Sequence, residues 1–294
     1  MGHVGTLDPG ADGVLPVLLG KATSLQDYLL EAPKAYSFTV IFGYETDSLD
    51  ADGLVVRHAP FAQITREHLL QAVAACGGEQ LQVPPAYSAV KFRGQPLYKL
   101  ARQGKASAAL CRDLSRTVQI YSLELEEFTL GRARFSLRCS KGTYVRVIAR
   151  ELAAYVGSCA TVVELRRTCS SGISLSQCFA LSCIEAALQS GSFDAERFIH
   201  PIEKLSLGLI TLQAADHRAS QRLLGGQELS YCHENFVGID GKNSDNNCQA
   251  LPAANETILL LRESGTALGL GVVLRRHADG CTVRMKRSLG YEQQ

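Results

Sequence analysis

Long apolar segments are missing from this 294-residue sequence. The longest apolar run near its start, from Val14 to Leu19, is interrupted by Pro16 and falls far short of the ~20 residues that a membrane-spanning helix needs. No secretory signal is expected, since Met1 leads directly into a turn-rich segment. The sequence also lacks internal repeats and low-complexity tracts, which excludes repeat architectures. With 46% apolar and 20% charged residues, it is typical of a globular protein.

Paired cysteine spacing is absent as well. None of the ten cysteines forms a Cys-x-x-Cys pair, so a zinc ribbon is not expected. Several of them, such as Cys76, Cys139 and Cys159, lie in apolar periodic segments, where a reduced cysteine behaves as a small hydrophobic residue. We therefore expect reduced thiols in a cytoplasmic protein, and no bound metal.

Two short patterns come close to ligand-binding motifs without completing them. Residues 48–53 begin like a calcium loop, but Ala59 stands where the bidentate glutamate is needed. Gly20 and Lys21 resemble the end of a phosphate-binding loop, but Leu15 stands where that loop needs glycine. Neither calcium binding nor nucleotide binding is therefore expected.

Positive charge is concentrated in one part of the chain. The net charge is only +1, yet residues 131–170 carry eight basic side chains against two acidic ones. The basic residues are Arg132, Arg134, Arg138, Lys141, Arg146, Arg150, Arg166 and Arg167. A basic face of this kind suits a phosphate backbone, and an ordinary solvated surface is the alternative.

Apolar periodicity predicts a mixture of strands and helices. Residues 132–139 alternate between apolar and mostly basic side chains, which predicts a strand with one buried and one basic face. Helical spacing of apolar residues over 145–156 predicts a helix that follows it. Another strand is expected at 36–43, with helices at 65–76, at 97–103 and, after a Ser182–Glu185 capping box, up to residue 188.

Asp8 lies in a segment that is rich in turn-forming residues, from Gly5 to Gly13. One interpretation is a pair of tight turns in which Asp8 bonds neighbouring N–H groups. The other is a carboxylate on a rigid loop, as a catalytic nucleophile or base requires. A carboxylate that stays ionised in a closed pocket needs a cation beside it, and Arg146 is a chemically suitable candidate. By contrast, His3, Tyr36 and Tyr144 show no local sign of function.

The order of motifs resembles that of the TruB-type pseudouridine synthases. The segment Gly2-His3-Val4-Gly5-Thr6-Leu7-Asp8-Pro9 is similar to the catalytic loop of that family. The motifs that follow in family order are Gly13-Val14-Leu15-Pro16, Gly20-Lys21-Ala22-Thr23, Lys34-Ala35-Tyr36, residues 46–53, 84–91, 97–104 and 139–146, and Leu165-Arg166-Arg167. Each motif is weak alone, but together they cover residues 2–170 in a specific order.

The resemblance implies a role for each site residue. Asp8 corresponds to the essential aspartate, and Arg146 to the arginine that pairs with it. Tyr36 corresponds to the tyrosine that stacks on the target base. Tyr144 corresponds to a residue that contacts the base, and Leu165 to an apolar residue of the pocket wall.

The resemblance also implies the reaction, which converts a uridine of the tRNA T-loop, at position 55, to pseudouridine. The uracil leaves its stack, is cut from C1′, rotates and rejoins through C5. His3 corresponds to the histidine that fills the space left by the flipped base, and Asp50 to an acidic residue that binds flipped RNA. No redox step or phosphate transfer occurs, so no cofactor is expected. Whether Asp8 attacks the base, attacks the sugar or removes a sugar proton is left open.

The implied fold is α/β (α+β). We expect a pseudouridine synthase catalytic domain over residues 1–205, built on a mixed, largely antiparallel sheet. A small PUA-like RNA-binding β domain is expected over residues 206–294, and the protein is expected to be a monomer that contacts the tRNA T-arm. The expected C-terminal strands are 257–262, 269–276 and 283–287, after a polar loop at 231–255.

One departure from the family pattern concerns the start of the sequence. Family members normally carry a further segment before the catalytic loop, with a Lys-Pro-x-Gly-x-Ser/Thr motif. We therefore expect the 294-residue chain to lack a strand and a helix of the core, to leave apolar surface uncovered, and to be unstable or poorly active.

Three alternative functions stay open at this point. The first is a catalytically impaired tRNA-binding or tRNA-folding chaperone of the same family. The second is an aspartate-dependent hydrolase, which needs a second acidic group near Asp8 or a metal. The third is a related synthase that acts on another RNA.

Overall fold

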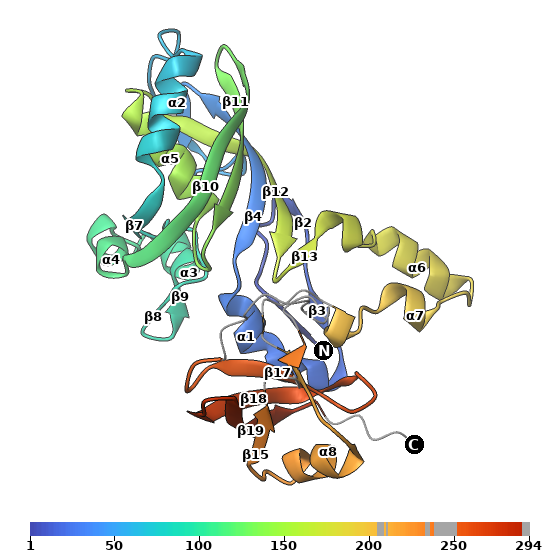
Figure 1. Ribbon diagram of the computed structural model, residues 1–294. Helices are drawn as coiled ribbons and strands as arrows, with labels where there is room; N and C mark the ends of the chain where they lie inside the picture. Colours follow the sequence, from blue (N-terminus) through green and yellow to red (C-terminus); the bar gives the residue numbers. More distant parts are fainter. Residues whose placement is uncertain (205–208, 210, 233–235, 238–251, 290–294) are drawn as a thin grey trace. The chain divides into compact units, whose positions relative to one another are not determined.

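The computed structural model describes residues 1–204, 209, 211–232, 236–237 and 252–289. The chain divides into two compact units (Figure 1). Unit A comprises residues 5–15 and 30–175, and unit B comprises residues 1–4, 16–29 and 176–294. The domain boundary expected at residue 205 stays a prediction.

A seven-stranded sheet forms the framework of unit A, in the order β13-β12-β4-β11-β10-β7, with β2 paired to β12. The strands are β2 (Ala11–Gly13), β4 (Lys34–Phe42), β7 (Gly78–Gln82), β10 (Arg116–Thr129), β11 (Arg132–Cys139), β12 (Ala160–Ser170) and β13 (Ile173–Ser174). Each pairing along this path is antiparallel, and only β2 runs parallel to its neighbour. The mixed, largely antiparallel sheet and the α/β fold class expected from the sequence are thus confirmed.

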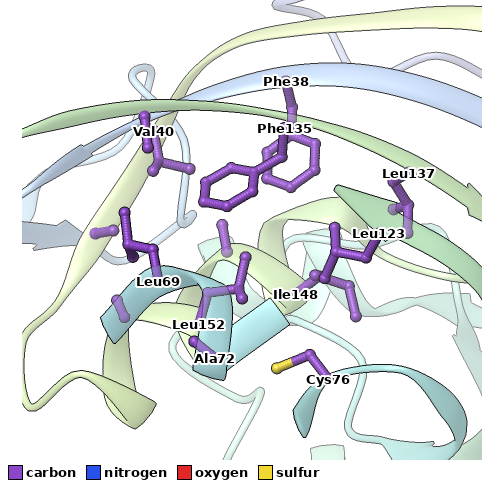
Figure 2. Close-up of a cluster of buried hydrophobic side chains, with 14 of the residues drawn as sticks. Phe38, Val40, Leu69, Ala72, Cys76, Leu123, Phe135, Leu137, Ile148 and Leu152 are labelled. Atoms are coloured by element: carbon purple, nitrogen blue, oxygen red, sulfur yellow. The ribbon is translucent and has the colours of Figure 1, made fainter. Parts of the chain in front are cut away.

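Two helices cover one face of this sheet, α2 (Arg66–Ala75) and α5 (Val145–Tyr155). Figure 2 shows Phe38 of β4 and Phe135 of β11 facing the helices, with Leu69 of α2 and Ile148 and Leu152 of α5 opposite. The two phenylalanine rings stack at a centroid distance of 5.3 Å. Burial of these apolar side chains stabilises the layer, at roughly 25 cal/mol per Å² removed from water. The core therefore fixes α5, which carries a central residue of the candidate site.

The two helices begin where their sequences predict. Thr65 caps α2 by accepting a hydrogen bond from the N–H of His68. Smaller elements complete unit A: β5 (Tyr44–Thr46), β6 (Val55–His58), β8 (Lys91–Phe92), β9 (Gln95–Pro96), α3 (Leu97–Arg102) and α4 (Ala108–Asp113).

A six-stranded sheet forms the core of unit B, in the order β15-β19-β18-β17-β14-β16. The strands are β14 (Thr211–Gln213), β15 (Leu229–Cys232), β16 (Phe236–Val237), β17 (Thr257–Leu261), β18 (Ala267–Arg276) and β19 (Gly280–Ser288). The three predicted C-terminal strands are confirmed as β17, β18 and β19. The loop predicted at 231–255 lies largely outside the described residues. Its described part includes the end of β15 and the whole of β16, and the PUA-like character stays a prediction.

The remaining elements of unit B are short. They are β1 (Gly2–His3), β3 (Val17–Leu18), the 3-10 helix η1 (Gly20–Leu25), α6 (Leu181–Gln189), α7 (Ala195–Phe198), the 3-10 helix η3 (Ile202–Lys204) and α8 (His217–Leu224). Two further elements, α1 (Gln26–Glu31) and the 3-10 helix η2 (Leu175–Gln177), contain residues of both units. The predicted capping box is wrong, because Ser182 lies inside α6 and Ala180 occupies the N-cap without a side-chain bond. Among the described residues, no helix combines the length and apolar character that a membrane span requires.

Candidate active site

Arg146 lies at the centre of the candidate site, in the first turn of α5. Its side chain is 4% exposed. Its Nε atom lies 2.8 Å from Oδ2 of Asp8, and its Nη1 atom lies 3.4 Å from Oδ2 of Asp50. A single guanidinium therefore holds two carboxylates, and the ion pair considered for Asp8 and Arg146 from the sequence is present.

Backbone carbonyls complete the surroundings of the Arg146 guanidinium. Nη1 donates to the Ser48 carbonyl at 2.6 Å, and Nη2 donates to the Tyr87 carbonyl at 3.0 Å. Although Nε is close to Asp8, its N–H finds no acceptor in hydrogen-bond geometry within the described part of the chain. The contact with Asp8 is thus an ion pair that leaves the carboxylate oxygens available for other bonds.

Asp8 occupies a turn between two anchored ends of the loop. The carbonyl of Asp8 accepts a hydrogen bond from the Ala11 N–H at 2.9 Å, which closes the turn. After the turn, β2 pairs with β12 and continues the main sheet. The side chain of Asp8 is 36% exposed, so its carboxylate is accessible from solvent while a buried cation balances its charge.

Asp50 is held by its own loop. The Ser48 hydroxyl donates to Asp50 Oδ1 at 2.5 Å, and the Thr46 hydroxyl donates to the Asp50 carbonyl at 2.6 Å. Asp50 also forms an isolated parallel bridge with Val162 of β12. The loop is thereby fixed against the sheet, with one carboxylate oxygen directed at the guanidinium of Arg146.

Tyr36 and Leu165 lie on neighbouring strands, β4 and β12, and both pack against the core of unit A. Burial raises the pKa of the Tyr36 hydroxyl to about 12, and the nearby thiol of Cys139 adds to this effect. The Arg167 guanidinium opposes the rise. Tyr36 therefore stays a neutral phenol at physiological pH, suited to stacking and hydrogen bonding rather than to proton removal.

Tyr144 is the N-cap residue of α5, two positions before Arg146. Buried Gln82 bonds both of its backbone groups: Tyr144 N–H donates to Oε1 at 2.7 Å, and Nε2 donates to the Tyr144 carbonyl at 3.3 Å. The guanidinium carbon of Arg116 lies 4.8 Å from the centre of the Tyr144 ring, a cation–π contact. Sequence reasoning missed Gln82 and Arg116, because neither belongs to a motif with a local signal.

His3 belongs to β1 in unit B, where it pairs with Val17 and is exposed. It thus belongs to a different unit from Asp8 and Arg146. Its role at the base-flipping step therefore stays a prediction, as do the catalytic and RNA-binding roles of the other site residues.

The basic residues of 131–170 do not form the single wet face that the sequence predicts. Arg146 and Arg167 are buried, because both bond groups inside unit A. Arg132 and Arg134 share the carboxylate of Glu164, at 2.9 and 3.5 Å. Two further ion pairs are Lys141–Glu31 and Arg166–Asp12. The interpretation as one open basic surface is wrong, since most of this charge is balanced locally.

A polar hollow of about 660 Å³ adjoins the loop on the side that follows Asp8. Residues Pro9 to Asp12 form one wall. The other walls are Ser37, Thr39, Arg134, Val163, Glu164, Leu165 and Arg166. Residues 9–12 of the loop therefore border open, polar space.

Comparison with known proteins agrees with this architecture. A solved H/ACA RNP bound to a substrate RNA containing 2′-deoxyuridine superposes with a TM-score of 0.69 at 19% identity, over 99% of this chain and 76% of that one. A Cbf5-Nop10-Gar1 complex gives a TM-score of 0.68 at 21% identity, over 98% and 76%. At these identities the likeness concerns the fold.

Sequence comparison is more specific. Residues 1–145 match the model of the TruB family pseudouridylate synthase N-terminal domain. The tRNA pseudouridine synthase B of Francisella tularensis subsp. novicida is 44% identical over 181 residues, which are 61% of this chain and 59% of that protein. That of Francisella philomiragia is 44% identical over 168 residues, 57% of this chain and 54% of the relative. The match thus spans little more than half the length of these relatives.

The fold is that of the solved Cbf5-containing complexes, and residues 1–145 resemble the class of the pseudouridylate synthases. Over the matched region, the sequence is similar to the TruB family of that class.

Proposed function

We propose that this protein isomerises a uridine of tRNA to pseudouridine, at position 55 of the T-loop, with Asp8 as the catalytic carboxylate. The observation that carries the proposal is the contact of 2.8 Å between the accessible carboxylate of Asp8 and the buried guanidinium of Arg146. The buried cation balances the charge of this carboxylate, and a carboxylate is a group that can act as a nucleophile or a base. The names of the Francisella relatives supply the class of substrate.

The neighbouring residues suit a flipped uracil. Tyr36 offers a neutral aromatic ring for stacking, and Leu165 on the adjacent strand offers an apolar wall. Tyr144 is proposed to contact the base, and Asp50 is proposed to bind the flipped RNA while it shares Arg146 with Asp8. Extruding a base costs a few kcal/mol, so a ready stacking partner lowers the energy of the extruded state.

The remaining parts of the proposal concern the partner. A T-loop presents splayed bases, which suits recognition by shape. We propose that His3 fills the space left by the flipped base, and that the sheet of unit B contacts the tRNA backbone as a PUA-like domain. The protein is proposed to act as a cytoplasmic monomer without a cofactor.

The test is turnover on an unmodified tRNA transcript, with pseudouridine mapped by position. Wild-type protein, Asp8→Asn and the matched control Glu126→Gln are compared, because Glu126 is an exposed carboxylate of β10. We expect product at one T-loop position for the wild type and the control, and none for Asp8→Asn.

A separate tRNA-binding assay tells catalysis from binding. If wild-type protein binds tRNA but yields no pseudouridine, the proposed reaction is wrong and an RNA-binding protein without turnover is favoured. Product at a different RNA position would reject the T-loop site while keeping the chemistry.

A further inference from the structure

Arg167 of β12 is a buried charge for which the proposed chemistry has no use. Its side chain is 2% exposed, and it is among the largest fully buried side chains in the described part of the chain. No carboxylate of the described residues lies within ion-pair distance of it. Burying a charge without a counter-ion is costly unless hydrogen bonds satisfy it. The bonds of this guanidinium therefore indicate what it is for.

Three backbone carbonyls that accept hydrogen bonds from the Arg167 guanidinium belong to the loop that carries Asp8, and Tyr36 also interacts with this guanidinium. Nε donates to the Val14 carbonyl at 2.7 Å, Nη1 to the Thr6 carbonyl at 3.2 Å, and Nη2 to the Gly5 carbonyl at 3.2 Å. Two acceptors precede Asp8 in the chain and one follows it. The planar fork of arginine thus joins the two ends of the loop.

The backbone of Arg167 holds the same loop. The Val14 N–H donates to the Arg167 carbonyl at 2.8 Å, and Gly13 is the register partner of Arg167 in the β2–β12 pair. A Cβ on Gly13 would come within 2.2 Å of the Arg167 carbonyl oxygen. Glycine permits this close approach, so main chain and side chain of one residue grip the loop together.

Arg167 also adjoins the stacking tyrosine. It is the register partner of Tyr36 across the β4–β12 pair, so β2, β12 and β4 place Gly13, Arg167 and Tyr36 in one row. Buried Lys34, two residues before Tyr36, donates to the carbonyls of Leu30 and Ala32. Arg167 is therefore bonded to the loop and is paired in register with Tyr36.

We propose that Arg167 is a positioning residue, which fixes the loop so that Asp8 meets both Arg146 and the base stacked on Tyr36. This inference rests on the proposed function. It implies that Arg167 sets the rate of the chemical step and not the affinity for RNA, because its guanidinium faces the loop carbonyls and is closed to solvent.

The test uses the full chain with Arg167→Lys and Arg167→Ala, measured as single-turnover rate at saturating tRNA transcript and as Kd for tRNA. Lysine keeps a positive charge but not the fork. We expect both variants to lower the rate by about tenfold to a hundredfold, because small misplacements of reacting groups have effects of this size. The Kd is expected to change by less than about twofold, since only interactions made in the transition state are lost.

Two controls separate positioning from stability. Leu69→Ala, in the same core on α2, lowers stability without touching the loop, and its rate is expected to equal that of wild type at temperatures where it is folded. Added millimolar guanidinium ion is expected to restore part of the rate of Arg167→Ala and none of the rate of Arg167→Lys, whose side chain fills the space.

The outcomes are distinct. Wild-type turnover together with unchanged rates in both folded Arg167 variants would overturn this inference and leave the proposed function intact. Loss of rate in proportion to stability, matched by Leu69→Ala, or failure of both variants to fold, would assign Arg167 to stability alone. Absence of turnover in the wild type would instead reject the proposed function.

Discussion

Replacing Arg146 by methionine tests the centre of the site. Methionine keeps much of the side-chain volume and removes the charge, so the packing of α5 against the core changes little. Asp8 and Asp50 lose their shared cation, and the carbonyls of Ser48 and Tyr87 lose their donors. We expect both the stability of unit A and the turnover to fall.

The size of the stability effect follows from the burial of the groups. Removing one partner of a buried ion pair costs about 3–5 kcal/mol. Asp8 and Asp50 keep part of their hydration, because their side chains are partly exposed, which favours the lower end of that range. Hydration does not replace the two buried backbone bonds. We therefore expect Arg146→Met to lower the free energy of unfolding by about 3 kcal/mol.

Urea unfolding followed by far-UV circular dichroism at pH 7 measures this change. A double-mutant cycle with Asp8→Asn isolates the contact between the two side chains, and a second cycle with Asp50→Asn serves for comparison. The first coupling energy is expected to lie at about 1–3 kcal/mol. The second is expected to be smaller, because the distance to Asp50 is 3.4 Å rather than 2.8 Å.

An unfolding free energy within about 0.5 kcal/mol of wild type would refute this reasoning, since exposed substitutions have effects of that size. A coupling energy near zero with Asp8 would do the same for the ion pair. Either result would mean that Arg146 and Asp8 do not share a common electrostatic site.

Three other predictions concern the frame of the site. Gly13→Ala is expected to lower the free energy of unfolding by about 1–3 kcal/mol and to reduce turnover. The reason is that the φ of Gly13 is +107° and that its added Cβ would lie 2.2 Å from the backbone of β12. Gly94→Ala, at a residue with φ +82° and open space around it, is the control for backbone strain alone in the same unfolding and rate assays. Burial raises the pKa of Tyr36 from its ordinary value of 10.0 to about 12, so its contribution to stability is full below pH 10 and falls as the pH rises toward 12. Between these pH values Tyr36→Phe is expected to lose roughly 2 kcal/mol less unfolding free energy than wild type, as measured by urea unfolding at each pH. An equal loss in both proteins would contradict this assignment. Gln82→Met is expected to cost about 1–3 kcal/mol, because the two backbone groups of Tyr144 lose their partner, and thermal unfolding that matches wild type would show that water replaces it.

Elements with an undisturbed period could be predicted from the sequence. Strand β11 occupies the predicted residues 132–139, and α5 begins at Val145 as expected. The long strand β10 was not predicted, although it is the longest of the sheet. Register shifts between Ile120 and Ser122, and between Leu125 and Glu127, break its alternation of buried and exposed side chains.

Strand β12 was also not predicted, for a different reason from β10. Its inward position 167 holds an arginine where a pattern search expects an apolar residue, and register shifts occur both before this position, between Val162 and Glu164, and after it, between Arg167 and Cys169. Arg167 was counted in the basic cluster of residues 131–170, although its side chain is buried. Charge counted along the chain therefore overstated the positive charge that is exposed on the surface.

The candidate site was partly predictable. The turn-rich loop and the chemistry of a carboxylate made Asp8 one candidate, the resemblance to the family loop implied its role, and Arg146 was named as a suitable partner. The sharing of Arg146 with Asp50 was not predictable, because the two residues meet only through the packing of a loop against β12 and α5. Contacts of Gln82 and Arg116 with Tyr144 depend likewise on the sheet order, which local patterns do not contain.

The grip of Arg167 on main-chain carbonyls has a consequence for mutational tolerance. A carbonyl is present whatever side chain its residue carries, so Thr6, whose side chain takes no part in the grip, can vary without loosening the loop. Only position 167 is constrained by its side chain, because no other residue provides three donors in a planar fork. Saturation mutagenesis scored by turnover would then show a permissive loop position facing an intolerant strand position, with no compensating substitution between the two.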